Sequence, residues 1–471
     1  MSHINIHTPG SRATGRNFRF GNGCCRLIVS LLVAASVAGC TLAPSSAENQ
    51  ARTHSSEVGD ALQPEAGRAT LPPAGAGLAD HMRFAVLNHP EVAAAYHEWH
   101  AAVTDIAPAR ALPDPQLTFE ADITDMLMTL MPGLMFDIMT PGKRGAMAAE
   151  RTATSEVARR VFVAQVLRVA ARVQREWIEL AYTAEATRLH HAAVDALEQQ
   201  RAIADASYAT GGMMASLATQ VEIQDMIAEH IAEHESAGDR LAAARTRFKS
   251  ALGLTPTDPD PAWPDAKLEA TPLPPEDELW RRTLAANPDL ARMRAMVEMT
   301  VAGVEVARKT GTPDFSVGLM TDLKASPLMF RPTASVSLPV WREKIAATIA
   351  GAEARREGAL ANVTAMQLEL AAELAQMLYM VRESDRMLAY IDGTALPTLD
   401  RMAELAGAGY QSGAGGAAMI TDAAVRTQLM RLKRIEVLRQ REDAATSLML
   451  MTADIAPADL AALTGADRPT P

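Results

Sequence analysis

Two groups of side chains in this sequence have the chemistry to bind a metal ion. The first is a cluster of methionines at Met126, Met128, Met131, Met135 and Met139. Thioether sulfur is a soft ligand that suits Cu(I) or Ag(I), but methionine is also a common filler of apolar space. We keep Met126, Met128, Met131 and Met135 as candidates, and we expect them to pack rather than to bind metal.

The second group is a pair of histidines. His230 and His234 stand four residues apart beside Glu229 and Glu233, and this spacing can hold zinc on one helix face. The order of residues differs from the HExxH of a metalloprotease. The adjacent histidines at 190–191 point in different directions on a helix. We therefore expect solvated side chains on a charged helix face, with no resident metal and no cofactor.

Catalytic motifs are missing from the sequence. It contains no glycine-rich phosphate loop, no GxSxG nucleophile turn and no CxxC pair. Its acidic residues are scattered along predicted helices instead of being paired in one place. We expect no catalytic residues and no enzymatic activity.

The composition narrows the class of protein. A net charge of −11 argues against a nucleic-acid partner. The 48% apolar content with only 4% aromatics is typical of long helices with small-residue contacts. Three cysteines are too few for a disulfide framework. No apolar run reaches about 18 residues, so a membrane crossing would have to use β-strands.

The first residues carry a targeting signal. Residues 1–39 contain four arginines and no acidic residue, and an apolar run from Leu27 to Ala38 follows the arginines. Small residues then precede Cys40. This pattern resembles a bacterial lipobox and predicts a lipoprotein signal peptide at 1–39, with Cys40 acylated at the mature N-terminus. In such signals a residue other than Asp after the cysteine, here Thr41, implies an outer-membrane destination. An ordinary signal peptide followed by a chance cysteine is the alternative.

The remainder of the chain reads as a tandem duplication. His89-Pro90 recurs as Asn287-Pro288, Pro113-Asp114 recurs as Pro313-Asp314, and Tyr208 with Gly211 recurs as Tyr410 with Gly413, at offsets of about 200 residues. We therefore predict a flexible N-terminal tether at 40–79, a first repeat at 80–254, a proline-rich linker at 255–276, a second repeat at 277–456 and a C-terminal tail at 457–471.

Four segments have the two-residue period of strands, namely 116–124, 134–139, 315–320 and 333–338. Alternation places one face in apolar surroundings and the other in water. A closed membrane barrel takes about eight strands or more. The pattern therefore predicts either a barrel shared between subunits or a half-buried sheet in a soluble protein.

The remaining segments predict helices at about 80–110 and 277–309 and long helices at 142–209 and 341–410, the last interrupted near Asp392 and Pro397. A period near 3.5 predicts a coiled-coil contact line along the first long helix. Its positions are Val166, Ala170, Val173, Trp177, Leu180, Ala184, Thr187, His191 and Val194.

This plan resembles the TolC-like outer-membrane efflux protein family, and is most similar to its heavy-metal and cation branch. The matching features are the lipobox, the duplicated His/Asn-Pro starts, Ala-Leu-Pro-Asp-Pro at 111–115, the junction at 140–144 and the Tyr-x-x-Gly turns. The resemblance implies a mainly α fold with a small membrane β part. Long α-helical hairpins would form an α-barrel tunnel, and four strands per subunit would join a trimeric 12-stranded β-barrel.

The function implied by the resemblance is passive conduction of solutes through the outer membrane. The solutes would be metal cations or drugs. The implied partners are two further copies in a homotrimer, a periplasmic adaptor protein, an inner-membrane pump of the RND type and outer-membrane lipid. The polar strand residues would line the pore, namely Gln116, Thr118, Glu120, Asp122 and Asp137. The alternative is a soluble periplasmic helical lipoprotein that acts as a spacer, an adaptor or a metal-binding protein.

The two glycine-rich turns correspond to the periplasmic tip in this family. Adaptor docking would fall on Gly211, Gly212, Ser216, Leu217, Gly413 and Met419, and plain helix-hairpin turns are the alternative. Tyr410 and Asp422 match gate positions. Other gate positions carry uncharged residues here, so a lock made of salt bridges is not expected.

Overall fold

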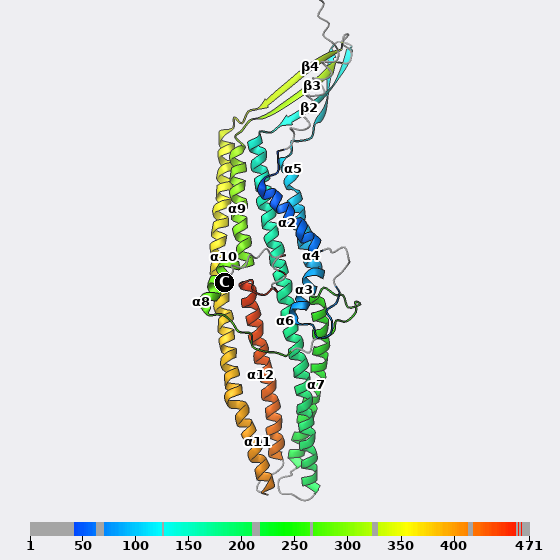
Figure 1. Cartoon of the computed structure of the whole chain (residues 1–471), viewed down its shortest axis with the longest axis vertical. Coiled ribbons are helices and arrows are strands. Elements are labelled where there is room, and N and C mark those ends of the chain that lie inside the picture. The colour runs from blue at the N-terminus through cyan, green and yellow to red at the C-terminus, as the bar shows by residue number, and fades with distance from the viewer. Residues whose placement is uncertain are drawn as a thin grey trace, which may run out of the picture. The chain divides into compact units, whose positions relative to one another are not determined.

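The computed structural model describes residues 42–62, 70–124, 127–209, 217–263, 267–322, 328–412 and 418–457, together with 460 and 463 (Figure 1). The described residues fall into two compact units. The sheet unit contains 110–144 and 314–337, and the helical unit contains the described parts of 44–109, 145–313 and 338–471. The signal peptide at 1–39 and Cys40 lie outside the described residues.

The sheet unit holds four strands, β1 (Gln116–Thr124), β2 (Leu127–Ile138), β3 (Asp314–Asp322) and β4 (Met329–Ser337). All neighbours are antiparallel, in the order β1-β2-β3-β4. The four predicted strands are confirmed. β2 begins seven residues earlier than the alternation indicated, because residues 127–133 continue the pairing with β1.

The register of the sheet continues each of its two faces across the strands. Leu117 pairs with Leu134, which pairs with Leu319. A second row, on the opposite face, contains Gln116, Met135, Gly318 and Thr333. Because side chains alternate along a strand, one face of the sheet is apolar and the other is largely polar.

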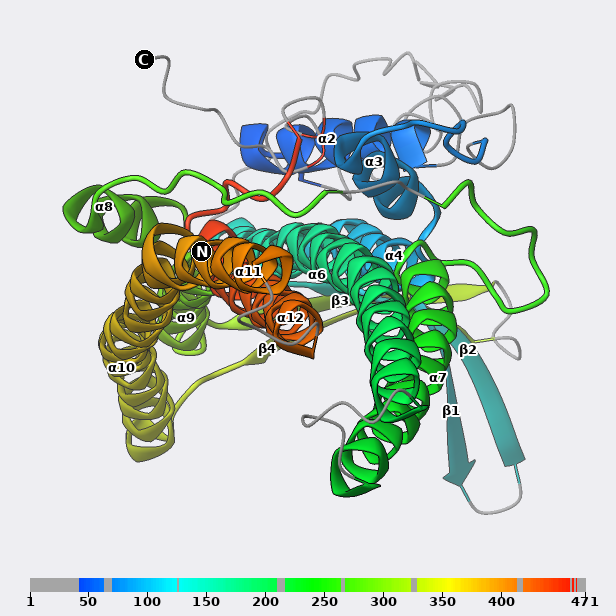
Figure 2. The ribbon, with the colours of Figure 1, turned by 90° about the horizontal axis from the view of Figure 1, so that it is seen from below.

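The helical unit repeats one plan twice, although α5 ends and α6 begins within the sheet unit. α2 (Ser46–Leu62) precedes the first repeat, which contains α3 (Leu78–Asn88), α4 (Pro90–Thr104), α5 (Ile106–Arg110), α6 (Pro141–Ala209) and α7 (Leu217–Ala251). The second contains α8 (Glu276–Ala286), α9 (Pro288–Lys309), α10 (Arg342–Tyr390), α11 (Leu396–Gln411) and α12 (Ala418–Met451). α6 lies beside α7, and α11 beside α12, in both views (Figures 1 and 2). Helices α3–α4 therefore correspond to α8–α9, and the long hairpins correspond to each other.

Each predicted short helix is divided at a proline. The residue before a proline is driven out of the helical region, whereas proline itself is favoured at the first helical position. His89 therefore ends α3 and caps α4, where its Nδ1 accepts a hydrogen bond from the Glu91 N–H at 3.2 Å. Asn287 does the same for α9 by accepting from the Leu290 N–H at 2.9 Å.

The expectation of a flexible tether at 40–79 is wrong for residues 46–62, which form helix α2. Val58 and Ser55 of α2 are buried. The Tyr96 hydroxyl of α4 donates to the backbone oxygen of Ser55 at 3.2 Å, and the Ser55 hydroxyl is 3.0 Å from Nδ1 of His100. These contacts with α4 stabilise α2 as a helix, although the composition of the segment alone does not predict one.

The predicted interruption of the second long helix is present, and it is a π-helix rather than a break. Residues Ile391–Ala395 form one π turn between α10 and α11. The backbone N–H of Leu396 reaches back five residues to the oxygen of Ile391. Pro397 has no N–H to donate to the preceding turn, so the helix accommodates it by widening.

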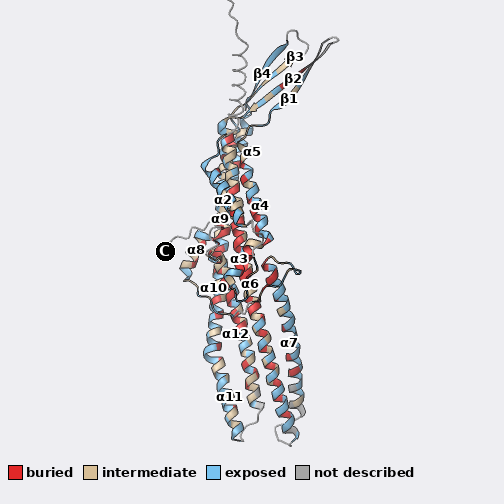
Figure 3. Cartoon of the chain, turned by 45° about the vertical axis from the view of Figure 1, so that its right-hand side comes forward, coloured by how far each residue is buried: buried red, intermediate tan, exposed pale blue. Residues whose placement is uncertain are grey.

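The predicted contact line on α6 is confirmed from Val166 to Leu180, and it is wrong beyond that point. Ala184 and His191 are exposed. Leu189 packs with Ile435 of α12, and Leu197 packs with Ile227 of α7 and Val425 of α12. The buried positions there are Ala186, Leu189, Ala193 and Leu197. Because α6 contacts two neighbours, a single repeating line does not describe it (Figure 3).

The largest apolar cluster of the helical unit forms around Trp99, Phe162 and Phe248, which come from α4, α6 and α7. The rings of Trp99 and Phe162 are stacked, with centroids 5.5 Å apart. Within the described part of the chain, every helix is too short or too polar to cross a lipid bilayer.

Candidate functional site

The apolar face of the sheet is exposed on every strand. Phe119 of β1 is 61% exposed, Leu134 of β2 is 42%, Phe315 of β3 is 42% and Val336 of β4 is 50%. A continuous apolar surface of this kind is rare on soluble monomers and marks a contact with lipid or with another molecule. The position of the large residues on one face agrees with the alternation in the sequence.

The opposite face carries most of the predicted pore-lining residues. The Gln116 side-chain amide donates to Asp137 Oδ2 at 3.0 Å, and the Ser316 hydroxyl donates to Asp137 Oδ1 at 2.5 Å. Asp137 therefore links the polar sides of β1, β2 and β3. Thr118 is half-buried and Glu120 is exposed, whereas Asp122 has no described side-chain environment.

An ion pair that the sequence reasoning did not anticipate joins the two repeats within the sheet unit. Lys143 Nζ lies 2.6 Å from Asp314 Oδ2. Lys143 belongs to the strand-to-helix junction of the first repeat, and Asp314 begins β3. Both residues stood in recognisable motifs, but nothing in the sequence indicated that they meet.

The methionine cluster does not form a metal site among the described side chains. Met131 is buried and Met135 is half-buried, and both lie on the same face of β2 as Gln116 and Glu120 of β1. Residues four apart in a strand are separated by about 13 Å, which is too far for one ion to bridge. The side chains of Met126 and Met128 lie outside the described residues.

The predicted docking and gate residues are only partly described. Gly211, Gly212, Ser216 and Gly413 lie outside the described residues, and Leu217 begins α7 without a described side chain. Tyr410 and Met419 are exposed.

Asp422 pairs with Arg426 of its own helix at 3.0 Å. A link across two elements, missed by the sequence reasoning, joins Arg434 of α12 to Asp392 of the π turn at 2.7 and 3.1 Å. Pairs of this kind depend on the helix rotation, which a sequence pattern does not give.

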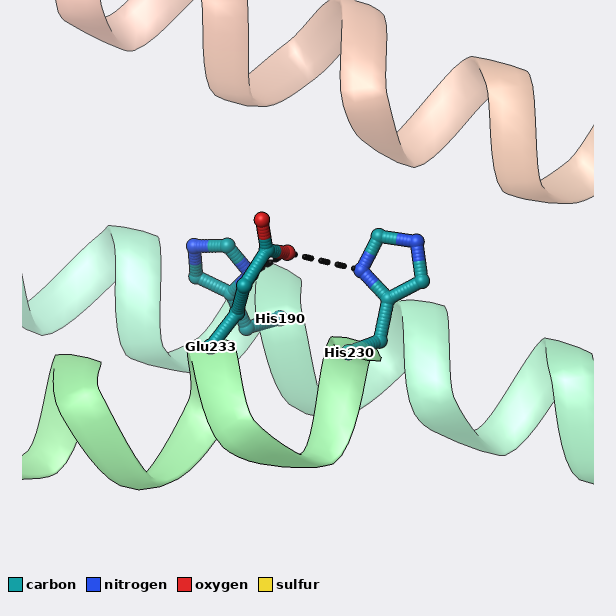
Figure 4. A group of neighbouring side chains, drawn as sticks. All are labelled: His190, His230 and Glu233. Atoms are coloured by element: carbon teal, nitrogen blue, oxygen red, sulfur yellow. Dashed lines mark hydrogen bonds and ion pairs between the residues drawn. The ribbon is translucent and has the colours of Figure 1, made fainter. Parts of the chain in front are cut away.

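The expectation that His230 is solvated is wrong. His230 on α7 is 8% exposed, and it faces His190 of α6 and Glu233 of α7 (Figure 4). Glu233 Oε2 is 2.8 Å from His230 Nδ1 and 3.5 Å from His190 Nδ1. The sequence pairing of His230 with His234 missed His190, because that residue comes from the other helix of the hairpin.

In the described chain, strand hairpins alternate with long helical hairpins, and the sheet is amphipathic. Residues 279–454 match the family model of the outer membrane efflux protein. This match covers the second repeat of the chain.

The relatives cover nearly the whole chain. The cobalt-zinc-cadmium resistance protein CzcC of Cupriavidus metallidurans is 25% identical over 415 residues, which is 86% of this chain and 95% of that protein. A crystal structure of CusC has a TM-score of 0.65 at 15% identity, over 82% of this chain and 98% of its own. The open state of the Neisseria gonorrhoeae MtrE outer membrane channel has a TM-score of 0.66 at 14% identity, over 80% and 89%. These structures share the fold of this chain.

Proposed function

We propose that this chain is the outer-membrane channel subunit of a tripartite efflux system, and that it conducts solutes passively from an inner-membrane pump to the outside. The observation that carries the proposal is the sheet, whose exposed apolar face and polar opposite face suit a wall between lipid and water. Its strands have nine to twelve residues, which is close to the roughly 9–11 that a tilted membrane strand needs.

The functional unit in this proposal is a homotrimer. Four strands are too few to close a membrane barrel, and three copies supply twelve. Within the described sheet, β1 and β4 each have one neighbouring strand. Pairing β4 of one copy with β1 of the next would satisfy both edges. The polar face would then line the pore, and the long helical hairpins would form the periplasmic tunnel.

Divalent metal cations are the proposed solutes. CzcC is described as a cobalt-zinc-cadmium resistance protein and aligns with most of this chain. The polar face carries Asp137 and Glu120, and rings of carboxylates favour cations in a pore. Asp422 would add a third acidic ring near the gate with Tyr410, although Arg426 offsets part of its charge.

The remaining parts of the proposal rest on the sequence and on the family. Cys40 would carry the lipid that anchors the chain to the outer membrane. The turns that contain Ser216 and Gly413 would dock a periplasmic adaptor, which connects the channel to a pump of the RND type.

Reconstitution tests the proposal directly. The mature protein should fractionate with the outer membrane, migrate as a trimer that heating dissociates, and produce discrete cation-selective conductance steps in planar bilayers. A protein that remains monomeric in detergent, leaves the membrane once its lipid is removed and produces no conductance would instead be a soluble periplasmic lipoprotein.

A further inference from the structure

The hairpin of α6 and α7 brings together two imidazoles and a carboxylate that are remote in the sequence. His190 comes from α6, and His230 and Glu233 come from α7 one turn apart. One ligand atom from each lies within 4.8 Å of the other two (Figure 4). The side chain of His190 is 13% exposed, that of His230 is 11% and that of Glu233 is 42%.

From this geometry we propose that His190, His230 and Glu233 form a binding site for one Zn²⁺ ion, or a divalent ion of similar preference, that fastens α6 to α7. Two imidazole nitrogens and one carboxylate oxygen are a common zinc ligand set that leaves a fourth position for water. The donor atoms of a tetrahedral zinc site stand about 3.4 Å apart. The spacings of 2.8 and 3.5 Å on either side of Glu233 Oε2 are close to that value.

The surroundings of the cluster favour a ligand role over a simple ion pair. Nδ1 of His190 is buried and has no hydrogen-bond partner among the described residues, although Glu233 lies close to it. A buried polar atom without a partner is costly, and a bound ion would satisfy it. Burial, more than any neighbouring charge, lowers the pKa of His190.

The ligand chemistry excludes the soft monovalent ions. The site offers nitrogen and oxygen and no sulfur, which suits Zn²⁺, Co²⁺ and related divalent ions rather than Cu(I). His234 and Arg240 also act on His190 electrostatically. Nδ1 of His234 is likewise buried without a hydrogen-bond partner among the described residues. Neither residue belongs to the group of three whose ligand atoms converge.

The test is zinc binding by the untagged, full-length mature protein, solubilised in detergent and stripped with a chelator. A competition titration with a zinc indicator should give about one ion per chain. X-ray absorption should show nitrogen and oxygen at about 2.0–2.1 Å, with imidazole scattering and no sulfur. His190→Gln, His230→Gln and Glu233→Gln should each lower the zinc affinity by more than about 100-fold. Mutating a residue that only hydrogen-bonds to a metal ligand already lowers metal affinity by about 10–100-fold, and each of these substitutions removes a ligand itself.

His191→Gln is the matched control, since it removes the neighbouring exposed histidine and should leave zinc affinity unchanged. Each variant is compared for helicity and oligomeric state. Any one of three results would overturn the proposal: the wild-type protein fails to bind zinc in the titration, its absorption spectrum shows sulfur ligands, or the three ligand variants and His191→Gln all bind zinc with equal affinity. If the variants misfold, the wild-type spectrum and stoichiometry still decide it. The site is independent of the proposed channel, so a protein without conductance could still bind the ion.

Discussion

Replacing Phe119 by arginine is the sharpest test of where the sheet meets lipid. Phe119 is 61% exposed on the apolar face and is the fourth of nine residues in β1, so in a membrane barrel it lies near the middle of the lipid layer. Arginine at that depth costs about 2–4 kcal/mol, or about 6–12 kcal/mol for three subunits. We expect trimer assembly to fail. Phe315, the second residue of β3, lies nearer the water and should tolerate arginine better.

The assay compares heat-dissociable trimer in outer-membrane fractions for Phe119→Arg, Phe315→Arg and Thr118→Arg. Thr118→Arg is the matched control, because this substitution adds the same charge on the opposite, polar face of the sheet, where residue 118 pairs with Gly133. We expect wild-type amounts of trimer for Thr118→Arg, reduced amounts for Phe315→Arg and almost none for Phe119→Arg. Normal assembly of Phe119→Arg, or failure of Thr118→Arg alone, would refute the assignment of the two faces.

Three further predictions concern the cap at His89, the π turn before Pro397 and the turn that contains Ser216. His89→Ala should lower the local stability of α4 by about 1 kcal/mol, seen as roughly five-fold faster amide exchange, whereas His89→Asn should retain the cap, as Asn287 does in the second repeat. Burial lowers the pKa of His89. The contribution of His89 to the stability of the folded protein is therefore fully present above about pH 6.5 and declines as the pH falls below that value. His89→Asn should remove this pH dependence. Pro397→Ala should replace the π turn by regular α-helix, measured by a crystal structure, and a retained π turn would show that Pro397 is not its cause. Ser216→Glu should weaken crosslinking to the adaptor without reducing trimer, and unchanged crosslinking would contradict the docking assignment.

The sequence predicted the parts of this fold that depend on local periodicity. Alternation placed Phe119 and Phe315 on the apolar sides of their strands, and the repeated His/Asn-Pro pairs indicated the duplication. The division of each short helix at its proline was not predicted. The sequence did not predict helix α2, because the segment is helical through partners on α4 that lie about 40 residues away, such as Tyr96.

The candidate sites show the same limit. Strand positions such as Gln116 and Asp137 could be assigned to one face because a sheet has only two. Residues on long helices can face several neighbours, so the meeting of His190 with His230, or of Arg434 with Asp392, depends on helix rotation and on the hairpin length. Neither quantity can be read from a spacing of three or four residues.

The strand order has a consequence for how copies of the chain would recognise one another. β2 of the first repeat pairs with β3 of the second inside one chain, and the free edges, β1 and β4, also belong to different repeats. In a closed ring, the junction between molecules would therefore imitate the junction within each molecule, and six similar hairpins would alternate between two sequences. The ring would approach six-fold symmetry while being encoded by three polypeptides, so each substitution in a hairpin would alter every second position around the circle.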